Sequence, residues 1–81
     1  MNQFFFMDRF CAEATFSDAE LIVIDGLRVE FGHGWGLVRA SNTTPCLVAR
    51  FEADDWARLE EIQALFKIQL HAIDRDLAIP F

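Results

Sequence analysis

The segment 39–45 holds the densest group of side chains that could bind a ligand. It reads Arg-Ala-Ser-Asn-Thr-Thr-Pro and lies between two apolar runs. Its donors are a guanidinium, an amide and three hydroxyls, carried by Arg39, Asn42, Ser41, Thr43 and Thr44. A guanidinium matches two oxygens of a phosphate or carboxylate, and hydroxyl and amide groups add further donors. This combination predicts an anion-binding loop.

Two interpretations of this segment stay open on the residues alone. Consecutive backbone N–H groups in such a turn can form a concave anion site, and Pro45 would fix the exit from the turn. Alternatively, the segment is an ordinary hairpin loop whose hydroxyls cap its own backbone. The local charge favours the first, because no Asp or Glu occurs from Phe31 to Phe51, while Arg39 and Arg50 fall inside.

Metal binding is not predicted. The soft ligands are two histidines and two cysteines, namely His33, His71, Cys11 and Cys46. None of these pairs has a metal-ligand spacing such as C-x-x-C or H-x-x-x-H. We therefore expect no metal and no other cofactor in this chain.

Catalysis by this chain alone is not predicted either. A nucleophile needs an activating base beside it, and Ser41 has no His or Asp in its own segment. The acidic pairs 54–55 and 60–61 are adjacent in sequence, so their side chains point apart. We interpret them as a helix cap and a solvated helix face.

The N-terminal part predicts a helix over residues 3–14. Phe6 and Phe10 recur one turn apart, which is typical of a buried helical face. No residue before the helix is assigned as its N-cap. Phe4 and Phe5 are expected to pack on the sheet. We also expect this chain to be a piece cut from a longer one. Residues 15–20 form a polar, turn-rich passage that ends the helix.

Four strands are predicted in the middle of the chain, over residues 21–24, 27–31, 35–40 and 46–51. The dipeptide Asp25-Gly26 separates the first two and is favoured in two-residue hairpin turns, where both residues need positive φ. Apolar and charged residues alternate over 27–31, which indicates one buried and one wet face. These features predict an antiparallel meander.

A final helix begins at Asp54 or Asp55. Apolar residues recur there every three or four positions, at Trp56, Leu59, Ile62, Phe66, Leu70 and Ile73. This stripe predicts the face that packs on the sheet, and residues 74–81 form a short tail. The order is α-β-β-β-β-α, so the predicted class is α+β: a four-stranded antiparallel sheet with two helices packed on one face.

Size and charge restrict the function further. The 81 residues form one domain, 1–81, and the net charge of −6 opposes a nucleic-acid partner, which needs a basic surface. Two cysteines cannot form a disulfide framework and fit a reducing compartment. The apolar run near the N-terminus is too short for a signal peptide or a membrane span. We expect a cytoplasmic protein with no membrane partner.

Three stretches closely resemble one known family. They are DGLRVEF (25–31), GWGLVRASNTTPCLVARFEAD (34–54) and AIPF (78–81). They resemble the C-terminal domain, domain 4, of the bacterial phosphomannomutase/phosphoglucomutase family in the α-D-phosphohexomutase superfamily. The likeness runs from about residue 22 to 81 and is weaker over 1–20, where only a helix of similar placement is expected.

The resemblance implies a function that the residues alone do not. Enzymes of this family are isomerases that interconvert the 1-phosphate and 6-phosphate of mannose or glucose. They use a phosphoserine, a bound Mg²⁺ and a bisphosphorylated intermediate. They have four domains, and the last resembles the fold of the TATA-box-binding protein without its DNA function.

The resemblance also assigns roles within segment 39–45. In the family, the R-x-S-N-T loop holds the substrate phosphate that is not being transferred. Carried over by position, the phosphate-binding residues are Arg39, Ser41, Asn42 and Thr43, with Thr44 a weaker candidate that shapes the loop. The family's serine loop, metal loop and sugar-contacting loop have no counterpart here, so no catalytic residue is expected in this chain.

The implied partners are hexose phosphates and the other domains of the parent enzyme. We expect the isolated domain to be inactive and to keep the family's own C-terminus. The alternative from a different class is a stand-alone α+β interaction module that uses Phe4, Phe5 and Phe6 as an apolar patch. Which hexose the parent prefers is not encoded in these residues.

Overall fold

The computed structural model describes residues 2–81 and has the predicted α+β order. The elements are α1 (Gln3–Glu13), β1 (Glu20–Val23), β2 (Leu27–Glu30), β3 (Gly34–Ala40), β4 (Leu47–Ala53) and α2 (Trp56–Ile73). The four strands form one antiparallel sheet in the order β1-β2-β3-β4, which confirms the meander. The strand ends differ from the predicted ones by at most two residues.

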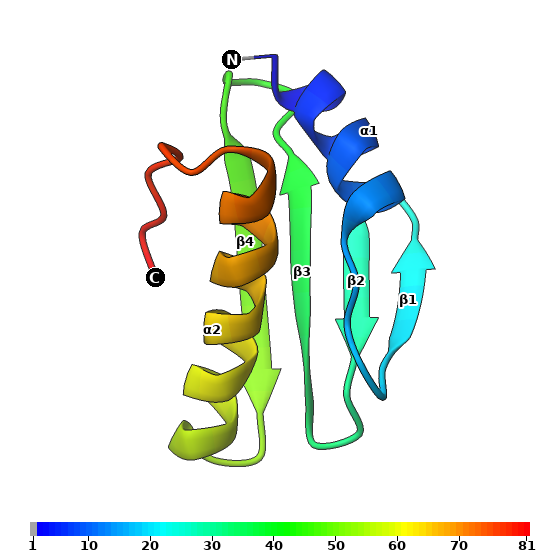
Figure 1. Ribbon diagram of the computed structural model, residues 1–81, viewed down its shortest axis with the longest axis vertical. Coiled ribbons are helices and arrows are strands. Elements are labelled where there is room, and N and C mark those ends of the chain that lie inside the picture. Colours follow the sequence, from blue (N-terminus) through cyan, green and yellow to red (C-terminus); the bar gives the residue numbers. More distant parts are fainter. Residues whose placement is uncertain (1) are drawn as a thin grey trace.

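Both helices cover the same face of the sheet, and the other face carries no helix (Figure 1). Alternation along the strands decides which face is covered. Leu27, Val29 and Val38 point toward the helices and are buried. The result is a two-layer structure with one core.

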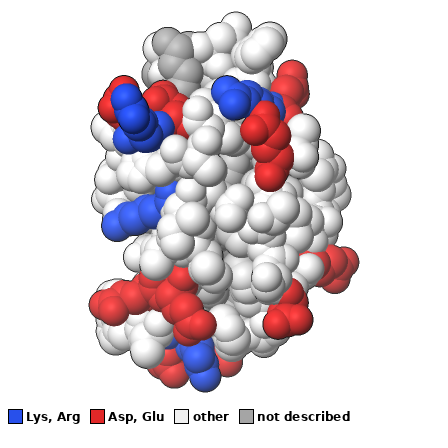
Figure 2. Space-filling model, in the orientation of Figure 1, with Lys and Arg blue, Asp and Glu red and all other residues white. Residues whose placement is uncertain are grey.

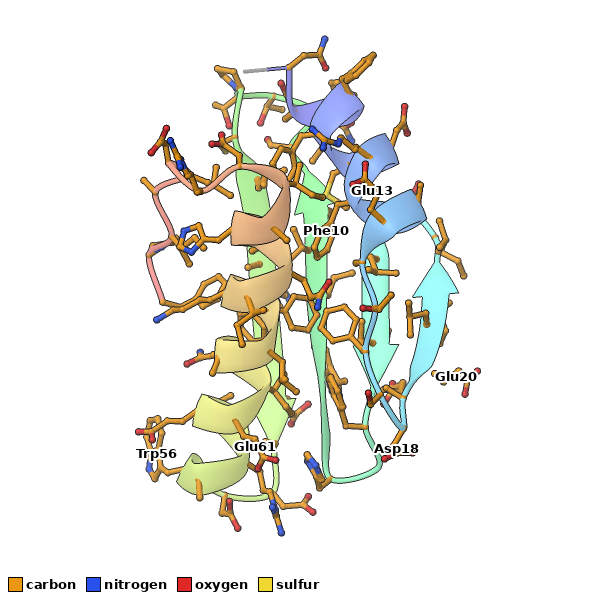
Figure 3. All side chains as sticks on the ribbon, viewed as in Figure 1. Phe10, Glu13, Asp18, Glu20, Trp56 and Glu61 are labelled. Atoms are coloured by element: carbon orange, nitrogen blue, oxygen red, sulfur yellow. The ribbon has the colours of Figure 1, made fainter. Side chains whose placement is uncertain are left out.

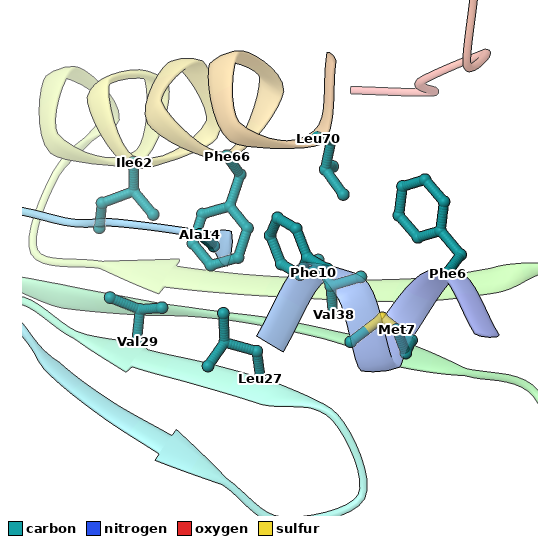
Figure 4. Packing of buried hydrophobic residues seen from close by; sticks show 10 residues of the cluster. All are labelled: Phe6, Met7, Phe10, Ala14, Leu27, Val29, Val38, Ile62, Phe66 and Leu70. Atoms are coloured by element: carbon teal, nitrogen blue, oxygen red, sulfur yellow. The ribbon is translucent and has the colours of Figure 1, made fainter. Parts of the chain in front are cut away.

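The core is built around two phenylalanine rings, one from each helix (Figure 4). Phe10 and Phe66 are both fully buried, and their ring centroids lie 6.4 Å apart. Phe66 also meets Phe51 of β4 edge to face at 5.2 Å. Figure 4 shows the ten buried residues, namely Phe6, Met7, Phe10, Ala14, Leu27, Val29, Val38, Ile62, Phe66 and Leu70.

The uncovered face of the sheet carries a group of paired polar and charged side chains. The Arg28 guanidinium carbon lies 4.3 Å from the Trp35 ring centroid, and the same side chain forms a 2.6 Å ion pair with Glu30. The Trp35 indole N–H donates to Glu52 at 3.1 Å. These contacts cover apolar ring surface with charged side chains, which lets the face remain in water.

The start of α1 corrects two expectations. Asn2 is an N-cap: its Oδ1 accepts hydrogen bonds from the backbone N–H groups of Phe4 at 3.1 Å and Phe5 at 3.0 Å. Asn is among the preferred capping residues, so the signal was present in the sequence. Phe4 and Phe5 do not pack on the sheet; they are 50% and 73% exposed, because the 3.6-residue period turns Phe6 inward instead.

The stripe on α2 is confirmed in its middle and wrong at its start. Ile62, Phe66 and Leu70 are buried, whereas Trp56 is 78% exposed and points away from the sheet (Figure 3). Trp56 is the first residue of α2 and lies beyond the sheet's edge. Asp55 caps this helix by accepting from the Arg58 backbone N–H at 2.8 Å.

The turn between β1 and β2 is one residue longer than predicted. Val23 pairs with Leu27, so three residues, 24–26, form the loop. Asp25 (φ 55°) and Gly26 (φ 143°) both have positive φ, as expected for this dipeptide. A Cβ on Gly26 would overlap the Val38 carbonyl oxygen. Glycine therefore lets this turn approach the end of β3 closely.

The C-terminal tail, residues 74–81, packs along α2 and β4. The Phe81 and Phe51 ring centroids are 4.7 Å apart, and His71 Nε2 lies 3.0 Å from the Leu77 carbonyl oxygen. A hollow of about 730 Å³, lined mainly by apolar side chains, lies between the tail and the sheet. The tail thus extends the apolar core beyond α2.

Neither helix in the described part of the chain is both long and apolar enough to cross a membrane. The face that carries the helices has charged side chains around its rim and a mostly uncharged middle (Figure 2). That face therefore offers no continuous basic surface for a polyanion.

Replacing Gly36 by alanine should destabilise the fold, because a Cβ there would overlap the Cε1 and Cζ atoms of Phe66. We expect the free energy of unfolding to fall by about 1–3 kcal/mol. Urea denaturation measures this change. The double variant Gly36→Ala/Phe66→Leu should lose less than the sum of the single variants, because the smaller side chain makes room for the methyl group. Additive losses would contradict the proposed contact.

Candidate functional site

The predicted anion loop joins β3 to β4 at the end of the sheet where α1 begins (Figure 1). Arg39 is the penultimate residue of β3 and pairs with Val48 of β4. The ladder then closes with the Ser41 N–H donating to the Cys46 carbonyl oxygen at 2.9 Å. The seven-residue pairing of β3 with β4 thus sets where the loop stands.

The guanidinium of Arg39 is half-buried and has spare donors. Its contact within the described chain is a long one, from Nη1 to the Ala40 carbonyl oxygen at 3.5 Å. Among residues 2–81, no carboxylate lies within salt-bridge distance of Arg39, whereas Arg9, Arg28 and Arg58 each have an acidic partner. Arg39 is therefore free to bind an external anion.

Ser41 organises the loop from within. It is 7% exposed, and its Oγ accepts from the backbone N–H groups of Thr43 and Thr44, both at 3.2 Å. The Thr44 hydroxyl also donates to it at 3.1 Å. The Ser41 hydroxyl thus caps the loop's own backbone, as in the alternative interpretation, and the N–H groups of Thr43 and Thr44 do not form an empty anion nest.

Asn42 and Thr43 supply the loop's outward groups. Both side chains are exposed. Within the described residues, neither the Asn42 backbone N–H nor its side-chain amide has a hydrogen-bond partner, and the Thr43 hydroxyl touches only Ser41 Oγ, at 3.3 Å. Asn42 and Thr43 therefore have donors available for an external group, whereas the Thr44 hydroxyl is bonded to Ser41 within the loop.

A hollow of about 580 Å³ lies beside Arg39 and Asn42, between α1 and the β1–β2 turn. The carboxylates of Asp8 and Asp25 line the same hollow. The stretch 31–51 contains no acidic residue, but acidic residues from other segments lie near it in the folded chain. These two charges repel an anion bound nearby, which weakens the interaction of Arg39 with it.

Cys11 also lines this hollow, and its surroundings lower the reactivity of its thiol. Burial raises the pKa of its thiol, and the negative charge of Asp8 raises that pKa further. The reactive form of cysteine is the thiolate, and both effects suppress it. Over residues 2–81, no group of three or more His, Cys, Asp or Glu side chains could hold a metal ion.

Gln3 contacts the 39–45 loop, which the sequence did not predict. Its Nε2 donates to the carbonyl oxygens of Ser41 and Thr44, both at 3.2 Å. The partners are 38 and 41 residues away in the sequence. No local pattern could have indicated this contact, because it depends on where α1 lies over the sheet.

Comparison with known proteins identifies a family. Residues 8–68 match the family model described as phosphoglucomutase/phosphomannomutase, C-terminal domain. A phosphomannomutase/phosphoglucomutase of Pseudomonas putida is 48% identical over 80 residues, and a phosphoglucomutase of Neisseria meningitidis is 61% identical over 62 residues. These alignments cover 99% and 75% of this chain.

A solved structure has the same fold. A phosphoglucomutase/phosphomannomutase family protein of Burkholderia thailandensis superposes with a TM-score of 0.88 at 47% identity, over 94% of this chain. The chain spans 17% of that protein, 17% of the Pseudomonas relative and 14% of the Neisseria relative. The similarity thus concerns one part of much longer proteins.

Removing the Ser41 hydroxyl should loosen the loop. In Ser41→Ala, the N–H groups of Thr43 and Thr44 lose their acceptor, and we expect a loss of about 1–2 kcal/mol of stability. Hydrogen exchange at the Thr43 and Thr44 amides should accelerate. Urea denaturation and amide exchange followed by NMR test both effects. Ser17→Ala, at an exposed serine, is the control; equal behaviour of the two variants would show that Ser41 does not organise the loop.

Proposed function

The chain belongs to the family of phosphoglucomutase/phosphomannomutase C-terminal domains, and we propose that its 39–44 loop holds the non-transferred phosphate of a hexose phosphate. The observation that carries this proposal is the unpaired Arg39 guanidinium beside the outward donors of Asn42 and Thr43. A phosphate dianion offers several strong acceptor oxygens, and a guanidinium can meet two of them at once.

Some loop residues would contact the phosphate, and others would hold the loop in shape. Arg39 would supply the charge, and Asn42 and Thr43 would donate an amide and a hydroxyl to the remaining oxygens. Ser41 would contribute to phosphate binding through the loop, since its hydroxyl holds the backbone of the residues that carry the other donors. The Thr44 hydroxyl points at Ser41 Oγ, so its contribution would be to shape the loop.

A phosphate clamp of this kind suits a mutase. A substrate that reacts at either of two positions must bind in two orientations, with either end in the clamp. Donors directed at the phosphate alone accept both orientations, because they do not contact the sugar. The clamp contributes positioning, so that the other end of the substrate reaches the reacting group in line.

The rest of the activity would reside in other parts of a longer protein. We propose that the chain is the C-terminal phosphate-binding domain of a four-domain phosphohexomutase acting on mannose or glucose 1- and 6-phosphates. A phosphoserine and a Mg²⁺ ion, both contributed by the other domains, would carry out phosphoryl transfer. The cytoplasm, where sugar phosphates are metabolised, is the proposed compartment.

The competing role as a stand-alone interaction module has weaker support. It was expected to use Phe4, Phe5 and Phe6 as one apolar patch, but Phe6 is 7% exposed and belongs to the core. Of these three phenylalanines, Phe4 and Phe5 lie on the surface. Two exposed rings from this group of three do not by themselves require a partner.

Inorganic phosphate titrated into the ¹⁵N-labelled chain tests the proposed function. The amides of residues 39–44 should shift first and saturate at millimolar phosphate. Arg39→Met should raise the dissociation constant at least about tenfold, because it removes hydrogen bonds between charged groups. Arg75→Met, which removes one charge at an exposed position of the tail, is the matched control. Shifts centred elsewhere, or equal losses in both variants, would exclude the proposed clamp.

The carboxylates near the loop provide a second test. Asp25→Asn removes a negative charge from the hollow and retains a side chain that tolerates positive φ. We expect phosphate to bind about two- to fivefold more tightly at low ionic strength, with the gain lost at high salt because exposed charges are screened. Asp18→Asn, at the chain's other positive-φ aspartate, should leave the affinity unchanged. An equal affinity of Asp25→Asn and the unmodified chain would contradict anion binding in this hollow.

A further inference from the structure

Gln3 connects the first turn of α1 to both ends of the anion loop. Its side-chain amide donates to the Ser41 carbonyl oxygen at 3.2 Å and to the Thr44 carbonyl oxygen at 3.2 Å. One side chain therefore joins the residue that opens the loop to the residue that precedes its proline exit. We propose that Gln3 is a positioning residue that fixes this loop in its phosphate-binding conformation, an inference that rests on the proposed function.

The bond to Ser41 controls the direction of a donor. In a trans peptide the carbonyl group and the following N–H point to opposite sides. Holding the Ser41 carbonyl against Gln3 directs the Asn42 N–H away from Gln3, where it has no partner among residues 2–81. It also keeps the partial negative charge of that carbonyl away from an anion approaching Asn42.

No other described group can replace Gln3 at this peptide. Within residues 2–81, the Ser41 carbonyl oxygen accepts from Gln3 alone, while the Thr44 carbonyl also accepts from the Cys46 N–H at 2.8 Å. Without the Gln3 amide, the Thr44 carbonyl oxygen keeps one hydrogen bond, whereas the Ser41 carbonyl oxygen loses the one it has. The Ser41–Asn42 peptide would then be free to rotate toward solvent.

Gln3 is itself held by a rigid element. Asn2 caps the helix directly before it, and Phe6, Met7 and Phe10 anchor the same helix in the core. A tether is useful for positioning only when its own end is fixed. The packing of α1 thus restricts the conformation of a loop almost forty residues away in the sequence.

Gln3→Met tests this role, because methionine keeps the length and helix propensity of glutamine and removes the donor. Gln69→Met is the matched control: Gln69 also tethers distant backbone, accepting from the Thr15 N–H at 3.0 Å, but away from the loop. Inorganic phosphate is titrated into each ¹⁵N-labelled chain, and the hydrogen exchange of the loop amides is measured alongside urea stability.

We expect Gln3→Met to raise the phosphate dissociation constant about three- to tenfold and to accelerate hydrogen exchange at Thr43 and Thr44, whose N–H groups are bonded to Ser41 Oγ. Gln69→Met should bind phosphate as the unmodified chain does, and Gln3→Lys, which restores a donor, should recover the slow exchange. Equal phosphate affinities in Gln3→Met and the unmodified chain would overturn the role of Gln3 and leave the proposed function intact. Equal weakening by both Gln→Met variants would also overturn it. Absence of saturable shifts at residues 39–44 in the unmodified chain would instead overturn the proposed function, and this role with it.

Discussion

The contact between Phe66 and Gly36 is the constraint on which the architecture depends. The buried Phe66 ring lies directly over the glycine in β3, where any side chain would overlap it. This close approach brings α2 down onto the β3–β4 pair and lets the same ring meet Phe10 of α1 and Phe51 of β4. In a domain of this size little apolar surface is available, so one ring that joins three elements stabilises a large share of the core.

The position of the anion loop follows from that packing. The register of β3 with β4 is fixed by the inward residues, because a slip of one residue would turn Arg39 toward the helices and Val38 toward water. Once the register is fixed, the loop begins at Ser41 and its buried hydroxyl closes the turn. Core packing, strand register and loop shape are thus three consequences of one arrangement of apolar residues.

The sequence was sufficient for those features that depend on local periodicity. Alternation over residues 27–31 predicted which face of the sheet is buried, and the helical spacing of Phe6 and Phe10 predicted the inner face of α1. The loop could be located because Arg39 and its polar neighbours interrupt two apolar runs. Trp56 was misplaced because periodicity gives the direction of a side chain and does not say whether the sheet extends beneath it.

Features that depend on distant contacts could not be derived in this way. The tether from Gln3 and the hollow shared by Asp8, Asp25 and Arg39 arise only when α1 and the β1–β2 turn come together at one end of the sheet. Residues 31–51 contain no acidic residue, which predicted an electrostatic potential around the loop more favourable to anions than the one in the folded chain. Electrostatic interactions depend on distance in space, so a charge count along the chain is a poor guide to them.

The opposing charges bear on how such a loop can hold a phosphate under the proposed function. One guanidinium faces a dianion while two carboxylates line the adjoining hollow, and the chain as a whole carries a net charge of −6. Attraction by this chain alone is therefore modest in water. The internal bonds of Ser41 reduce the entropy lost on binding, because the loop is ordered before the anion arrives. Other domains would supply the remainder of the affinity by adding cationic groups and by excluding water from the site. The same donors bind more strongly in a lower dielectric. Under the proposed function, a loop with this balance would bind a phosphate tightly only when groups from other domains surround the anion as well.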